Sequence, residues 1–167
     1  MANALLLLSG LALLLLQGVL AYIAPSDYLA PTLILPAVLF VAVGQFSLTR
    51  GVSLAFVLGY LTDVFAGASM GLWTFTLVSI FLLVRAAGLK LFLHGVVFQV
   101  LLTFVAGVIV GLEMMSLLLV FDRRPLAVLA AVGLVAAQSA VTAAFAPVVF
   151  ALLERLPGAS AAPVEET

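Results

Sequence analysis

Charged residues are so scarce in this chain that they decide what it can fold into. Only 8% of the 167 residues are Asp, Glu, Lys or Arg, whereas 66% are hydrophobic. A water-soluble domain of this length needs a charged exterior, and the chain has too few charges to build one. The apolar runs are long enough to cross a hydrocarbon layer about 30 Å thick, which takes roughly 20 helical residues. We therefore predict an integral membrane protein over almost the whole length.

Prolines, glycines and charges divide the apolar sequence into six predicted transmembrane helices. These helices occupy residues 4–24, 30–49, 51–66, 71–88, 91–111 and 125–153. The segment 51–71 either spans fully or is re-entrant, because its arms are short. The stretch from residue 91 exceeds one membrane thickness, so we expect an interfacial turn or a tilted extension after Gly111. The fold class is thus an all-α bundle forming one domain, residues 1–156, followed by a short disordered cytoplasmic tail, residues 157–167.

The positive charges indicate which way the bundle faces. Residues 1–24 lack the charged start of a signal peptide, so we expect them to stay as the first helix. An even number of spans puts both termini on one side of the membrane. If that side is the cytoplasm, it receives Arg50, Arg85, Lys90 and Arg155, and the outside receives only Arg123 and Arg124. The excess predicts that both termini are cytoplasmic.

The residues that enzymes and metal sites require are missing or isolated. The chain has no cysteine and one histidine, His94, so a thiolate or histidine metal site is not expected. It has no serine–base motif, and only Asp63 among the aspartates lies at membrane depth. A net charge of −1 gives no basic patch for nucleic acid. We expect no catalytic residues, no metal and no cofactor.

A glycine-lined face with one carboxylate is the most distinctive local pattern. Gly59, Asp63, Gly67 and Gly71 are each four residues apart, which in a helix gives one face with little side-chain bulk. Such faces let membrane helices approach closely. A charge on this face is costly against lipid, so Asp63 is expected to contact a partner, or a neighbouring helix through Arg85 or a backbone amide. The equally weighted alternative is a boundary residue that is hydrated or caps the turn.

Other positions carry expectations about packing and anchoring. Pro36 should kink the second helix. A second small stripe is expected to pack tightly inside the bundle or against a partner: Gly133, Ala137, Ala140 and Ala144. Interface anchors are expected at Trp73, Arg85, Lys90, Arg123 and Arg124. Gln45, Gln99 and Gln138 should hydrogen-bond between helices, and Glu113 should be hydrated among the headgroups.

One stretch of the chain resembles a known family. Residues 51–71 read GVSLAFVLGYLTDVFAGASMG, with Gly51, Gly59, Asp63, Gly67 and Gly71 as the skeleton. This pattern resembles the signature of the rod shape-determining protein MreD family, and PTLILP at residues 31–36 is similar to that family's second span. The C-terminal half matches only in hydropathy.

The resemblance implies a non-enzymatic scaffold in the bacterial inner membrane, a subunit of the cell-elongation machinery that organises peptidoglycan synthesis. Its expected partners are MreC, then RodA and its penicillin-binding transpeptidase, with MreB indirectly, and membrane lipid. The family is also similar in fold to the substrate-binding subunits of energy-coupling-factor transporters. The alternative function is therefore vitamin binding near the outer face, around Asp63, Trp73 and Glu113.

Overall fold

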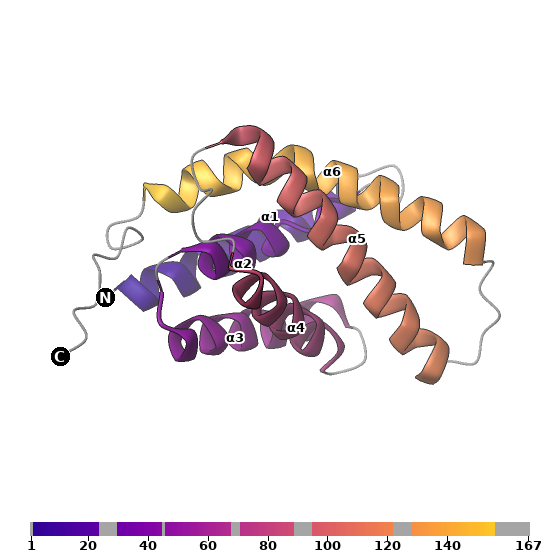
Figure 1. The fold of residues 1–167 in the computed structure, drawn as a ribbon, viewed down its shortest axis with the longest axis horizontal. Coiled ribbons are helices and arrows are strands. Elements are labelled where there is room, and N and C mark those ends of the chain that lie inside the picture. Colours follow the sequence, from indigo (N-terminus) through magenta and orange to yellow (C-terminus); the bar gives the residue numbers. More distant parts are fainter. Residues whose placement is uncertain are drawn as a thin grey trace.

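The computed structural model describes residues 2–23, 30–44, 46–67, 71–88, 95–121 and 128–155. Within these ranges the chain forms six α-helices and no strand, so the predicted all-helical class is confirmed. The helices are α1 (Ala2–Ile23), α2 (Ile34–Val43), α3 (Leu48–Ala66), α4 (Leu72–Ala86), α5 (Val96–Phe121) and α6 (Val128–Glu154). Figure 1 shows α3 and α4 as one antiparallel pair and α5 and α6 as another. The start of α1 and the end of α6 lie at the same end of the bundle, on the left of the figure.

Four of the helices are long and apolar enough to cross a membrane. They are α1, α3, α5 and α6, whereas α2 and α4 are shorter apolar helices. At 1.5 Å per residue, the 10 residues of α2 extend about 15 Å and the 15 residues of α4 about 22 Å. The helices of a membrane protein are present, but the predicted second span, residues 30–49, is helical only in part.

The short helix α2 is the centre of the bundle. All ten of its residues are buried, and it contacts α1, α3, α4, α5 and α6. A helix that is apolar on every side suits such a position because no face is left for water. Phe40 of α2 packs edge-on against Phe150 of α6, with ring centroids 5.6 Å apart.

Pro36 does not kink a longer helix, as the sequence suggested. It is the third residue of α2, where the backbone N–H would have no partner within the helix in any case. Proline is tolerated in this first turn because the carbonyl with which its ring would clash lies outside the helix. The expected kink was wrong because α2 begins later than the hydropathy indicated.

The fifth helix continues through Gly111 to Phe121. We expected either an interfacial turn or an extension of the helix after Gly111. The turn is not formed, and the helix is extended instead. Two glycines inside the helix allow close packing on α6, because added Cβ atoms at Gly107 and Gly111 would meet Ser139 and Val135. Glycine usually weakens a helix interior, but here the tight α5–α6 contact explains its presence.

Candidate functional site

Asp63 caps a helix other than its own. Its side chain lies near the end of α3 and is only 2% exposed. The carboxylate accepts hydrogen bonds from the backbone N–H groups of Gly71, Trp73 and Thr74 at 3.0, 2.8 and 3.1 Å. The Thr74 hydroxyl donates a fourth bond, 2.6 Å long. Because the N-cap residue of α4 is Gly71, which has no side chain, Asp63 supplies the acceptor that the first turn lacks.

This geometry separates the interpretations of Asp63 left open by the sequence. The contact with backbone amides of a neighbouring helix is present, and it is also a cap on the turn. The expectation that Asp63 is hydrated at the membrane boundary is wrong, since its carboxylate is buried and both of its oxygens accept hydrogen bonds from the protein. A negative charge at the amino end of α4 is further stabilised by the helix dipole.

The glycines before Asp63 bring α3 close to α4. A Cβ atom added at Gly59 would lie 2.6 Å from Thr74 Cα, and one at Gly51 would overlap the Phe81 ring. Gly67 and Gly71 are not part of this helical face; they form the ends of the turn with φ of +59° and +96°. Of the two contacts expected for this face, with a partner or with a neighbouring helix, the second is formed, and Gly51, Gly59 and Asp63 are buried inside the protein.

Arg85 forms hydrogen bonds at the opposite end of the α3–α4 hairpin from Asp63. It lies in the last turn of α4, and its guanidinium donates to the carbonyl oxygens of Ala42 (3.3 Å), Gly44 (2.8 Å) and Phe46. These carbonyls lie in the last turn of α2 and directly after it, where backbone acceptors have no partner within the helix. Rather than pairing with Asp63 or serving only as a headgroup anchor, Arg85 stabilises the carboxyl end of the central helix.

The small-residue stripe of α6 faces outward. Gly133, Ala137, Ala140 and Ala144 are all exposed, whereas the other side of α6 is buried, including Ser139. An added Cβ at Gly133 would meet nothing within 4 Å. Of the two expectations, packing inside the bundle is therefore wrong, and the stripe remains open to lipid or to another polypeptide.

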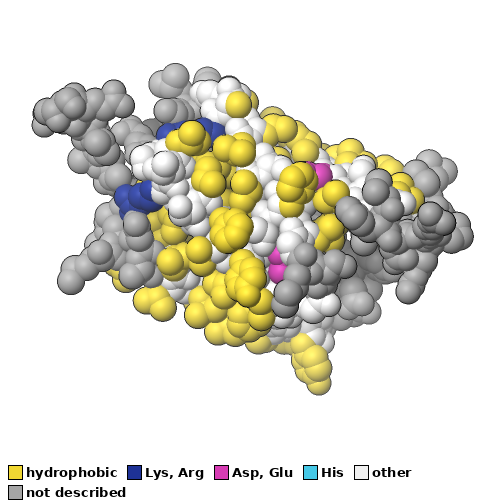
Figure 2. Space-filling model, turned by 90° about the horizontal axis from the view of Figure 1, so that it is seen from below, with side chains coloured by type: hydrophobic (Ala, Val, Ile, Leu, Met, Phe, Trp, Pro, Cys, Tyr) yellow, Lys and Arg dark blue, Asp and Glu magenta, His cyan; other side chains and the backbone are white. Residues whose placement is uncertain are grey.

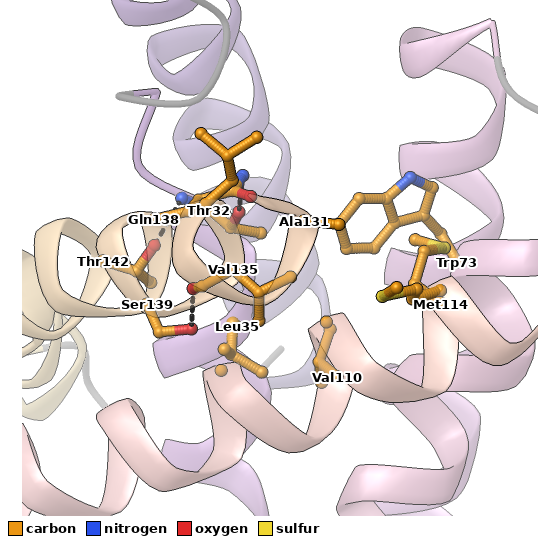
Figure 3. A pocket seen from close by; sticks show the side chains of 14 residues that line it. Thr32, Leu35, Trp73, Val110, Met114, Ala131, Val135, Gln138, Ser139 and Thr142 are labelled. Atoms are coloured by element: carbon orange, nitrogen blue, oxygen red, sulfur yellow. Dashed lines mark hydrogen bonds between the residues drawn. The ribbon is translucent and has the colours of Figure 1, made fainter. Parts of the chain in front are cut away.

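A cavity of about 320 Å³ lies between α2, α4, α5 and α6, and it is partly open to the surface. Figure 3 shows Trp73 and Met114 on one side of it, facing Thr32, Gln138 and Thr142 on the other. The backbone N–H of Thr32 donates to Thr142 Oγ1 at 3.0 Å. Gln138 Nε2 donates to Thr32 Oγ1 at 3.4 Å, so the partner of Gln138 lies in the segment just before α2 and not, as we expected, in a second helix.

The cavity does not gather the residues that the vitamin-binding alternative requires. Trp73 lines it, but neither Asp63 nor Glu113 does. Glu113 instead interacts with the Ser79 side chain of α4, so it is partly buried rather than simply hydrated. Among the described residues, no three histidine, cysteine or acidic side chains come together as a metal site.

Several expectations concern residues outside the described part of the chain. In addition, one group of residues was missed from the sequence. The positions outside the described part are Gln45, Lys90, His94, Arg123, Arg124 and the tail. The missed group is the cavity lining, whose one visible signal was the polar spacing of Gln138, Ser139 and Thr142 along α6. Thr32, which completes it, lies more than 100 positions away in sequence and gave no local signal.

Known proteins give no independent guide to this arrangement: no family model, no curated protein and no solved structure matches the chain.

Proposed function

We propose that the chain is a non-enzymatic scaffold of the bacterial cell-elongation machinery that binds MreC through its membrane helices. The observation that carries the proposal is the structural unity of the motif Gly51–Gly71. Gly51 and Gly59 allow α4 to pack closely on α3, and Asp63 caps the first turn of α4. Gly67 and Gly71 lie at the two ends of the turn between these helices. Each residue of the MreD-like pattern thus has a structural role in the α3–α4 hairpin. This supports a relationship to the MreD family over a chance match in spacing.

The distribution of charge supports an inner-membrane orientation with cytoplasmic termini. Arg50 lies in the first turn of α3, Arg85 in the last turn of α4, and Arg155 directly follows α6. In the antiparallel arrangement of Figure 1, these positions share the end at which α1 starts and α6 stops. Figure 2 shows basic side chains at that end, with the visible acidic ones away from it. Basic residues concentrate on the cytoplasmic side of membrane proteins.

Burial of the glycine face of α3 changes where the partner contact belongs. Association of helices in lipid depends on close packing, which small side chains permit. The outward stripe of α6 retains this property, whereas Gly51 and Gly59 are already covered by α4. We therefore place the contact with the membrane helix of MreC on Ala137, Ala140 and Ala144.

Co-purification with MreC in mild detergent tests the proposal. The double variant Ala137→Leu/Ala140→Leu adds bulk to the stripe and should reduce recovered MreC at least tenfold. Ala12→Leu is the matched control, because Ala12 is exposed on α1, and it should retain the wild-type amount. Absence of MreC from the wild-type preparation would refute the scaffold proposal. Equal recovery from all three proteins would leave the scaffold standing but remove α6 as its contact.

A further inference from the structure

The cavity between α2, α4, α5 and α6 has a polar side and an apolar side. Figure 3 shows the polar side built by Thr32, Gln138, Ser139 and Thr142 and the apolar side by Trp73 and Met114. The Thr142 hydroxyl accepts a bond from Thr32 N–H and still has a hydrogen to donate. The Ser139 hydroxyl donates to the Val135 carbonyl and still has lone pairs to accept. A donor and an acceptor are therefore available beside one apolar wall.

The lining also limits the charge of any occupant. Among the lining residues that the structure describes, none is an aspartate, glutamate, lysine, arginine or histidine. A charged group in such a place would lose its hydration without gaining a counter-ion, which costs far more than burying a neutral group. The geometry points to a binding site for a neutral amphiphile whose hydroxyl or carbonyl group meets Gln138, Ser139 and Thr142 and whose apolar body lies against Trp73 and Met114.

The volume sets the size of the apolar body. A cavity of about 150 Å³ holds benzene, so about 320 Å³ accommodates on the order of a dozen non-hydrogen atoms. This is too small for a whole phospholipid but fits the ester carbonyl and the adjoining carbons of one lipid chain, or a free small molecule. Methionine side chains, here Met114 and Met115, adapt well to flexible apolar ligands.

The tryptophan of the apolar wall makes binding measurable. Trp73 is the only tryptophan in the chain, so its fluorescence reports this cavity without a label. The probe is ω-bromodecanol, a neutral amphiphile of suitable size whose bromine quenches tryptophan on contact. Added to the full chain in lipid nanodiscs without MreC, it should quench Trp73 in a saturable manner. The inference is thus tested independently of the scaffold role.

Two variants separate binding in the cavity from collisions in the bilayer. Ala131→Leu places bulk in the cavity, since Ala131 is part of its lining, and it should weaken saturable quenching at least tenfold. Ala151→Leu makes the same change at an exposed position of α6 outside the lining, and it should bind as the wild type does. Thermal unfolding of each variant verifies that the fold is kept.

The polar side is tested by a change of ligand as well as of protein. Gln138→Leu should weaken quenching by ω-bromodecanol about fivefold, the value of one neutral hydrogen bond near 1 kcal/mol. Quenching by bromodecane, which lacks the hydroxyl, should be unaffected by this substitution. Equal losses for both probes would show that Gln138 does not read the polar group, and would overturn that part of the assignment.

Nanodiscs made with chain-brominated phosphatidylcholine distinguish the two sources of ligand. If a lipid chain enters, these nanodiscs quench the wild type more than Ala131→Leu, and ω-bromodecanol competes with the lipid. If a free molecule is the ligand, brominated lipid quenches both proteins equally while ω-bromodecanol still saturates only the wild type. Linear, variant-independent quenching by both probes would overturn the proposed site.

Discussion

At the scale of single residues, the two central charges stabilise helix ends within the protein. Asp63 accepts bonds from the first turn of α4, and Arg85 donates to carbonyls at the carboxyl end of α2. A helix end buried in an apolar surrounding needs such partners, because water is not there to replace them. Two of the few charges in the chain therefore allow short helices to begin and end inside the bundle.

Neutralising Asp63 tests this role. Asp63→Asn keeps the shape but loses charge-assisted bonds, and we expect it to lower the free energy of unfolding in micelles by about 2 kcal/mol. Glu154→Gln removes an exposed carboxylate at the end of α6 and should change stability by less than about 0.5 kcal/mol. Denaturant titration followed by Trp73 fluorescence measures both. Similar stability of the two variants would contradict the capping role.

At the scale of helices, identical substitutions should have opposite effects in α3 and α6. An alanine at Gly59 must fit a Cβ where Thr74 Cα is 2.6 Å away, so overpacking should destabilise Gly59→Ala by about 1–3 kcal/mol. At Gly133 the added atom meets nothing, and Gly133→Ala should gain up to about 1 kcal/mol from helix propensity.

Thermal unfolding in the same detergent compares the two glycine variants. A drop in Tm for Gly59→Ala alongside a rise for Gly133→Ala is the expected pair of results. If Gly59→Ala were also stabilising, the α3–α4 backbones would have to lie farther apart than described here.

The sequence was enough to predict where helices form. It was a poorer guide to where each helix ends and to which helices it contacts. Apolar runs and the glycine turn after Asp63 located the six helices that the structure describes, because lipid-length segments and breakers are local signals. The length of α2 was missed because hydropathy does not distinguish a buried helix from an apolar extended segment. The inward face of α3 and the outward face of α6 both consist of small residues, and only the fold reveals which one is covered.

At the scale of the whole molecule, a short buried helix, α2, is surrounded by longer helices whose lengths match a bilayer. The central helix α2 is shorter than a bilayer is thick, whereas the longer α1, α3, α5 and α6 have lengths that match one. Exposed apolar side chains such as Phe56, Tyr60 and Phe75 are then expected, since the surrounding solvent is hydrocarbon. The proposed scaffold would act by lateral contact, because most of the described residues lie in apolar helices.

The placement of the two ends of α3 tests the membrane arrangement most directly. The chain contains no cysteine, so single cysteines can be introduced without background. Ser47 directly precedes α3, Ala66 is its last residue, and both are exposed. In spheroplasts, a membrane-impermeant maleimide should label Ala66→Cys and should reach Ser47→Cys only after lysis. Labelling of both positions from outside, or of Ser47→Cys alone, would contradict a helix that crosses the membrane with its arginine end in the cytoplasm.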